Sequence, residues 1–137
     1  MTNRSKQIGT AGETAVVRYA REHGFPLADR RVQKGRYDEG DVLLTVGAIL
    51  EVKSGKAAAT ASYNQKMAWL AEAETERVNA RADVTALVVQ RNAYGTGRVE
   101  WWEFWWTETF PVGPLPACCT LANGLLRLRH SGWGDPL

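Results

Sequence analysis

The sequence predicts an α/β fold in which a central mixed β-sheet of about five strands is flanked by helices. Two observations predict this class: short apolar segments of strand length, and two longer segments in which apolar residues recur at helical spacing. The expected helices cover residues 9–23 and 61–81. The expected strands cover residues 25–32, a hairpin within residues 41–53, and residues 83–90 and 99–107.

The chain has the size and composition of one folded domain. It has 137 residues, 45% of them hydrophobic, so a core can form. We expect a main unit over residues 1–108, which begins with a basic arm, and an extension over residues 109–137 that packs on it. The polar N-terminus and the adjacent Cys118 and Cys119 predict neither a signal peptide, a disulfide framework nor a zinc site. A reduced, cytoplasmic protein without a membrane span is expected.

The first predicted helix carries an acidic residue, Glu13, at the edge of its apolar stripe. Gly9 or Thr10 can begin this helix, and Gly24 ends it. From the residues alone, two interpretations of Glu13 stay open. Its carboxylate points toward the end of the sheet as part of a site, or it is a first-turn acid that complements the helix dipole.

The predicted hairpin holds the strongest candidate site. Strand residues two apart share a face, so Glu51 and Lys53 project together, and antiparallel pairing brings Asp41 beside Glu51. Two oxygen ligands and a cation at the end of a sheet suit a hard metal ion with an attached catalytic lysine. Asp38, in the preceding polar loop, is a rival for Asp41, which we prefer because it starts the strand. The alternative is that these are surface charges at strand ends.

After Lys53, Lys56 is expected at the mouth of this site, and the second long helix follows. Its expected inner face is formed by Tyr63, Met67, Leu70, Ala71, Glu74 and Val78. The acidic residues Glu72, Glu74 and Glu76 are predicted to form a solvent-exposed face and not a second metal site.

The last predicted strand is rich in aromatic residues. Alternation places two triplets on opposite faces: Trp102, Phe104 and Trp106, and Trp101, Glu103 and Trp105. One face can fill the core. The other is too apolar for solvent and predicts a homodimer interface. A stacking platform for DNA is the weaker interpretation, because no basic residues interleave. Beyond this strand, several leucines over residues 121–128 predict a short strand or helix that covers an edge.

Positive charge is concentrated near the start of the chain. Residues 1–36 carry eight Arg or Lys and three acids, although the whole chain has a net charge of only +2. Such local fields attract phosphate backbones, whereas the alternative is a solvated surface that confers solubility. The predicted DNA contacts are Arg4, Lys6, Arg30, Arg31, Lys34, Arg36 and, further along, Lys56.

The order of motifs is a helix with Glu13, Gly40-Asp41 before a strand, a hairpin, Glu51-Val52-Lys53, a long helix and a strand. This order resembles the PD-(D/E)XK nuclease superfamily. The compact size and the opening SKQIGTAGE of residues 5–13 are similar to the archaeal-type Holliday junction resolvases and their phage relatives. The resemblance covers roughly residues 4–106. Gly40 stands where the superfamily usually has proline, and the resolvase branch tolerates glycine at this position.

The resemblance implies a restriction-endonuclease-like core and a Mg²⁺-dependent endonuclease, in which Mn²⁺ substitutes. The implied metal ligands are Asp41, Glu51, the Val52 carbonyl and Glu13, and Lys53 is expected to orient or deprotonate the attacking water. Gln65 is the implied polar helper on the long helix, with a solvated Gln as the alternative. The implied substrate is a four-way (Holliday) junction in a bacterial or phage-infected host cell. A homodimer through Trp101–Trp106 would match the junction's two-fold symmetry.

Other functions stay open. A nuclease of the same fold that cuts branched DNA, or any DNA, shares the same site. A DNA-binding module without catalysis needs only the basic N-terminal region. The presence of Asp41, Glu51 and Lys53 together favours an enzyme, because a non-catalytic protein need not keep all three.

Overall fold

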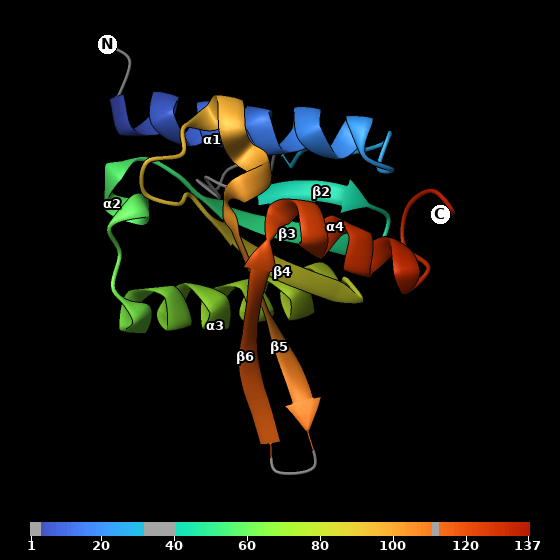
Figure 1. Ribbon diagram of the computed structural model, residues 1–137. Coiled ribbons are helices and arrows are strands. Elements are labelled where there is room, and N and C mark those ends of the chain that lie inside the picture. Colours follow the sequence, from blue (N-terminus) through green and yellow to red (C-terminus); the bar gives the residue numbers. More distant parts are fainter. Residues whose placement is uncertain (1–3, 32–40, 111–112) are drawn as a thin grey trace.

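The protein folds as one mixed β-sheet with helices on both faces (Figure 1). The computed structural model describes residues 4–31, 41–110 and 113–137. The helices are α1 (Arg4–Glu22), α2 (Lys56–Ala59), α3 (Tyr63–Ala80) and α4 (Leu121–His130), with a 3₁₀ helix η1 (Thr96–Trp101). The strands are β1 (Asp29–Arg30), β2 (Asp41–Thr45), β3 (Ala48–Lys53), β4 (Val84–Val89), β5 (Glu103–Phe110) and β6 (Gly113–Thr120).

The six strands follow one another across the sheet in chain order. All neighbours are antiparallel except β3 and β4, which are parallel and are joined through α2 and α3. The predicted α/β class with a mixed sheet flanked by helices is confirmed, with six strands where about five were expected.

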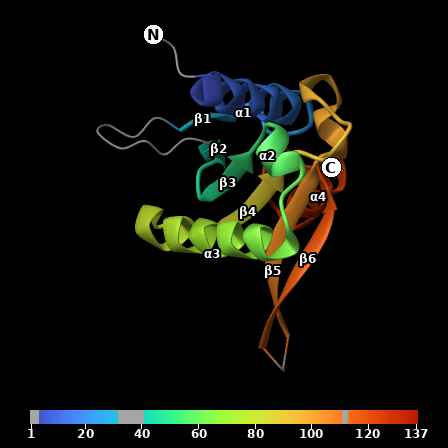
Figure 2. The same cartoon turned by 90° about the vertical axis from the view of Figure 1, so that its left-hand side faces the viewer.

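The two faces of the sheet have separate cores. Helices α1 and α4 cover one face, and α3 covers the other (Figures 1 and 2). The larger core joins α1 and α4 to the sheet through residues such as Val16, Val42, Leu50, Trp102 and Leu125. The smaller core lies under α3, where Leu70 packs with Leu87 and Val89.

The β2–β3 hairpin forms as predicted, with a turn in which Gly47 has a φ of +86°. L-amino acids with a side chain rarely adopt this angle, so glycine suits the turn. The turn also anchors the next parallel strand, because the Gly47 carbonyl accepts hydrogen bonds from the backbone N–H groups of Asp83 and Val84.

Helix α3 agrees with the predicted helix in its extent but not in its inner face. Ser62 caps its start by accepting a hydrogen bond from the Gln65 backbone N–H. The buried residues of α3 are Leu70 and Ala73, whereas the predicted Ala71 and Val78 are exposed. The helix is therefore rotated about its axis, so that a different face from the predicted one packs on the sheet.

Two predicted strands have other bounds in the structure: the first is shorter, and the last begins and ends later. Only Asp29–Arg30 of the expected strand at residues 25–32 pairs with β2, because Phe25 and Ala28 are buried in a turn after α1. Residue 32 lies outside the described residues. In the last predicted strand, residues 99–101 belong to η1, so β5 begins at Glu103 and Trp101 does not alternate with it.

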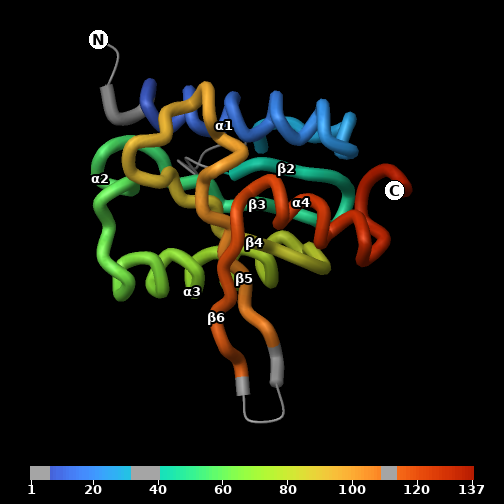
Figure 3. The backbone as a smooth tube through the Cα atoms, in the orientation of Figure 1, coloured from blue at the N-terminus to red at the C-terminus, as the bar shows by residue number. Residues whose placement is uncertain are grey.

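The C-terminal residues are an integral part of this sheet. Strand β6 pairs with the whole of β5, and Leu121 and Leu125 of α4 enter the larger core. The expected boundary at residue 108 therefore falls inside β5. The β5–β6 hairpin reaches well beyond the rest of the sheet (Figure 3). Among the described residues, no helix is both long enough and apolar enough to cross a membrane.

Candidate metal centre

Asp41 and Glu51 lie directly opposite one another on β2 and β3. Their neighbours Val42 and Leu50 point into the larger core, so alternation turns both carboxylates toward the face covered by α3. Only 2% of Asp41 and 5% of Glu51 is exposed. Asp41 Oδ2 and Glu51 Oε2 are buried without a hydrogen-bond partner in the described part of the chain. Buried acceptors of this kind are costly unless a cation or a donor satisfies them.

The proximity of these acids changes the chemistry of Glu51. Burial, then the adjacent Asp41 carboxyl and the charge of Glu76, raise the pKa of Glu51 to about 10. Lys53 acts in the opposite direction, with its Nζ 3.3 Å from Glu51 Oε1. Without a further cation, Glu51 therefore keeps a proton at neutral pH.

Lys53 is held between the sheet and α3. It follows Val52, whose side chain enters the larger core, and shares its face with Glu51 as predicted. Its Nζ also lies 5.5 Å from the centroid of the Trp69 ring on α3, within the range of a cation–π contact. The Lys53 side chain is 25% exposed, so the ammonium group borders both the acids and solvent.

A third acid, Glu76, joins Asp41 and Glu51. One ligand oxygen from each of the three carboxyl groups lies within 4.8 Å of the others. The prediction of a solvent-exposed face holds for Glu72 and Glu74 but is wrong for Glu76, which is half-buried. Glu76 shares a helix face with Ala73, three residues earlier, and the burial of Ala73 becomes visible only in the structure.

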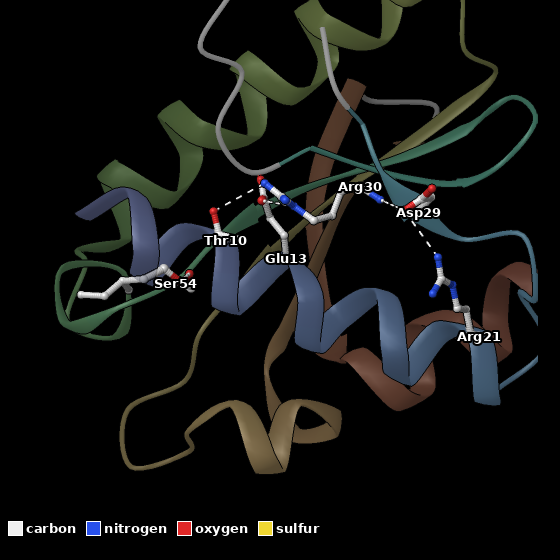
Figure 4. Close-up of polar contacts among 7 residues, drawn as sticks. Thr10, Glu13, Arg21, Asp29, Arg30 and Ser54 are labelled. Atoms are coloured by element: carbon white, nitrogen blue, oxygen red, sulfur yellow. Dashed lines mark hydrogen bonds and ion pairs between the residues drawn. The ribbon is translucent and has the colours of Figure 1, made fainter. Parts of the chain in front are cut away.

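Glu13 occupies a different place. Its carboxylate is buried, and Oε2 accepts a hydrogen bond of 2.9 Å from Arg30 Nε (Figure 4). Gly12 makes this placement possible: a Cβ at residue 12 would collide with the Ser54 side chain, so glycine lets α1 approach the end of β3. Among the described residues, the acids whose oxygens converge are Asp41, Glu51 and Glu76, and Glu13 is not one of them.

One of the predicted DNA-contacting arginines, Arg31, lies beside the acids. The Arg31 backbone N–H donates to the Asp41 carbonyl, and Arg31 Nη1 lies 3.8 Å from Asp41 Oδ2. The neighbouring Arg30 belongs to the edge strand β1, and its side chain is 42% exposed. Arg31 thus places positive charge beside Asp41, whereas Arg30 pairs with Val42 and its guanidinium group contacts Glu13 of α1.

The other predicted contacts are more dispersed. Lys56 is exposed at the start of α2, and Gln65 is exposed in the first turn of α3. Gln65 and Glu76 are separated along the helix axis by about 16 Å, so Gln65 is not brought to the acids.

Lys34, Arg36 and the rival acid Asp38 lie outside the described residues, as do the side chains of Arg4 and Lys6 in the first turn of α1.

The aromatic face that predicted a homodimer is covered only in part within the chain, since Trp105 is half-buried whereas Trp101 is 44% exposed. Trp105 makes an edge contact with Tyr63 of α3, at 6.2 Å between ring centroids, and Lys66 Nζ lies 5.9 Å from the Trp105 ring. Strand β5 is also flanked on both edges, by β4 and β6. The dimer through Trp101–Trp106 stays a prediction, in which Trp101 is the more exposed of the two tryptophans on this face.

Comparison of the chain with protein-family models, with curated proteins and with solved structures finds no match. Two buried carboxyl groups, each with an oxygen that has no hydrogen-bond partner among the described residues, lie with Lys53 at 3.3 Å and Arg31 at 3.8 Å. This arrangement can bind a divalent cation next to an anionic substrate.

Proposed function

We propose that the protein is a Mg²⁺-dependent DNA endonuclease that hydrolyses phosphodiester bonds at the site of Asp41, Glu51 and Lys53. The observation that carries this proposal is the pair of buried carboxyl groups on β2 and β3, with Lys53 Nζ 3.3 Å from Glu51. Each of the two carboxyl groups has an oxygen without a hydrogen-bond partner among the described residues. The resemblance to PD-(D/E)XK nucleases supports the same three residues.

The acids fit a hard divalent cation. Mg²⁺ takes oxygen ligands and is commonly held by one or two carboxylates together with waters. Asp41 Oδ2 and Glu51 Oε2 supply two such oxygens, and binding of a cation would displace the proton that Glu51 otherwise retains. When bound, the ion would polarise the scissile phosphate and lower the pKa of water beside it.

Lys53 has the position of the residue that orients the attacking water. The Glu51 carboxylate on one side and the Trp69 ring on the other fix its ammonium group. From there it can donate a hydrogen bond to water and offset the negative charge that builds on the phosphate. A group held in place before the reaction gives this stabilisation without a cost of reorganisation.

The arginines at the same edge support a polyanionic substrate. Arg31 lies next to Asp41, and Arg30 precedes it on β1 opposite Val42. Guanidinium groups pair with phosphates through two parallel hydrogen bonds. Within this class, we propose a four-way DNA junction cut by a homodimer, as the resemblance implies. A nuclease for branched DNA, or for any DNA, uses the same centre and is the alternative.

The test is cleavage of four matched substrates, namely duplex, flap, single-stranded and four-way-junction DNA, with Mg²⁺ or with EDTA. We expect wild type to cut DNA with Mg²⁺ but not with EDTA, and we expect Asp41→Asn to cut DNA in neither condition. Asp29→Asn is the matched control, because Asp29 is an exposed acid on the adjacent strand β1. Cleavage of duplex as fast as junction favours the alternative, and DNA binding with no cleavage of any substrate rejects the enzyme.

A further inference from the structure

Helix α3 brings a carboxylate to the site from the side opposite to α1. Asp41 and Glu51 point toward the face that α3 covers, and oxygens of Asp41, Glu51 and Glu76 lie within 4.8 Å of one another. We infer that Glu76 is the third protein ligand of the metal site, and that Glu13, which the resemblance implied for this role, instead positions Arg30. This inference rests on the proposed function.

The surroundings of Glu76 explain why it reaches the acids. Leu70 and Ala73 bury the same face of α3 against the sheet, where Leu70 packs with Leu87. Leu87 is the partner of Glu51 in the parallel β3–β4 pair, so the helix lies over the strand next to the acids. Glu76 follows Ala73 by three residues and therefore projects from the same face.

An independent observation indicates a cation at this point. Asp41 Oδ2 and Glu51 Oε2 are buried on side chains that are more than nine-tenths buried, and each is without a hydrogen-bond partner among the described residues. If all three acids are ionised, their carboxylates at this separation repel one another strongly in a medium of low dielectric constant. A divalent cation bound among them would satisfy the buried oxygens and neutralise the repulsion.

Glu13 makes contacts of a different kind. Its Oε2 accepts from Arg30 Nε at 2.9 Å, and Thr10 on the preceding turn of α1 accepts from Arg30 Nη2 at 3.5 Å (Figure 4). The two α1 residues together fix the guanidinium group at the sheet edge. Since the Arg30 side chain is 42% exposed, it can contact a phosphate while Glu13 holds it. Glu13 is therefore a positioning residue.

The experiment is calorimetric titration of Mg²⁺, and separately of Mn²⁺, into the metal-free full-length protein. We expect Glu76→Gln to weaken metal binding by at least about 10-fold. Glu76→Asp should weaken it as well, because it keeps the charge but withdraws the carboxylate by one methylene. Glu13→Gln and the exposed control Glu72→Gln should bind as wild type does. Circular dichroism and thermal unfolding without metal check that each variant is folded.

The outcomes separate this inference from the proposed function. If Asp41→Asn and Glu51→Gln lose the metal but Glu76→Gln does not, the inference is overturned and the nuclease proposal stands. If Asp41→Asn and Glu51→Gln bind metal normally, the proposed function fails. Loss of metal in Glu13→Gln to the same extent as in Glu76→Gln also overturns the inference.

The positioning role of Glu13 has its own readout. In metal-free buffer, Arg30→Ala and Glu13→Gln should each weaken binding of a junction DNA, as measured by fluorescence anisotropy. The double variant should bind as weakly as Arg30→Ala alone, because Glu13 acts through Arg30. Additive losses would contradict the assignment.

Discussion

The two faces of the sheet are formed by the same strands but carry different kinds of side chain. Toward α1 and α4, β2 and β3 present Val42, Leu50 and Val52 to a large apolar core. Toward α3, the alternate positions of the same strands present Asp41, Glu51 and Lys53. Alternation along a strand thus lets one hairpin supply stability on one face and reactive groups on the other. Buried acids are destabilising, so the first face must offset the cost of the second.

The largest expected effect on stability lies on the face toward α1 and α4. Trp102 is fully buried there, and its Nε1 donates to the Tyr94 carbonyl at 2.9 Å. Trp102→Ala should lower the free energy of unfolding by about 3–5 kcal/mol. Trp105, half-buried under α3, is the matched control, and Trp105→Ala should cost ~1–2 kcal/mol. Urea unfolding measures both, and equal losses would remove the contrast between the two faces.

On the face toward α3, removing an acid should stabilise the metal-free protein. Glu51 has a folded pKa of about 10, raised from 4.5. As pH rises between these values, the unfolded chain releases the proton while the folded chain keeps it, so the free energy of unfolding falls. Glu51→Gln should therefore add about 3 kcal/mol at pH 7, and the gain should shrink toward pH 4.5.

Urea unfolding in EDTA at pH 5 and pH 7 measures this difference. Glu72→Gln, on the exposed side of α3, serves as the control and should show no such dependence on pH. A gain for Glu51→Gln that is equal at both pH values would show that the proton on Glu51 is not its cause.

The smallest effect is expected at Lys56, which is exposed at the start of α2. Lys56→Ala should change the free energy of unfolding by less than about 0.5 kcal/mol. If Lys56 contacts a phosphate, the variant should bind all DNA sequences more weakly. The slope of the logarithm of the binding constant against the logarithm of the salt concentration should also decrease by about one. Anisotropy titrations at several salt concentrations test this, and an unchanged salt slope would remove Lys56 from the DNA contacts.

The hairpin that carries Asp41 and Glu51 was predictable because its register depends on local features. The turn at Gly47 and the apolar residues on both strands predict an antiparallel hairpin. The facing of Asp41 and Glu51 also depends on an irregularity of β2 between Leu43 and Thr45, because regular pairing continued from Thr45 and Ala48 would place Asp41 opposite Val52. Lys53 shares the face of Glu51 because it is two residues further along the strand.

Glu76 was not predictable in the same way, because it depends on how α3 is rotated against the sheet. Tyr63 and Val78 suggested one face, yet the helix buries the small Ala73, which allows close packing. Strand β6 was missed for another reason. Pro114 and Pro116 argue against a strand, but β6 is an edge strand, where a missing N–H need not break a ladder.

We propose that Lys53 acts in phosphodiester hydrolysis next to the two carboxylates. The most direct measurement is single-turnover cleavage of a labelled four-way junction by wild type and Lys53→Ala at saturating protein with Mg²⁺. We predict that Lys53→Ala binds the junction but cuts it ~10²–10³-fold more slowly, since it loses a preorganised donor. Cleavage by folded Lys53→Ala at the wild-type rate would contradict the proposed mechanism.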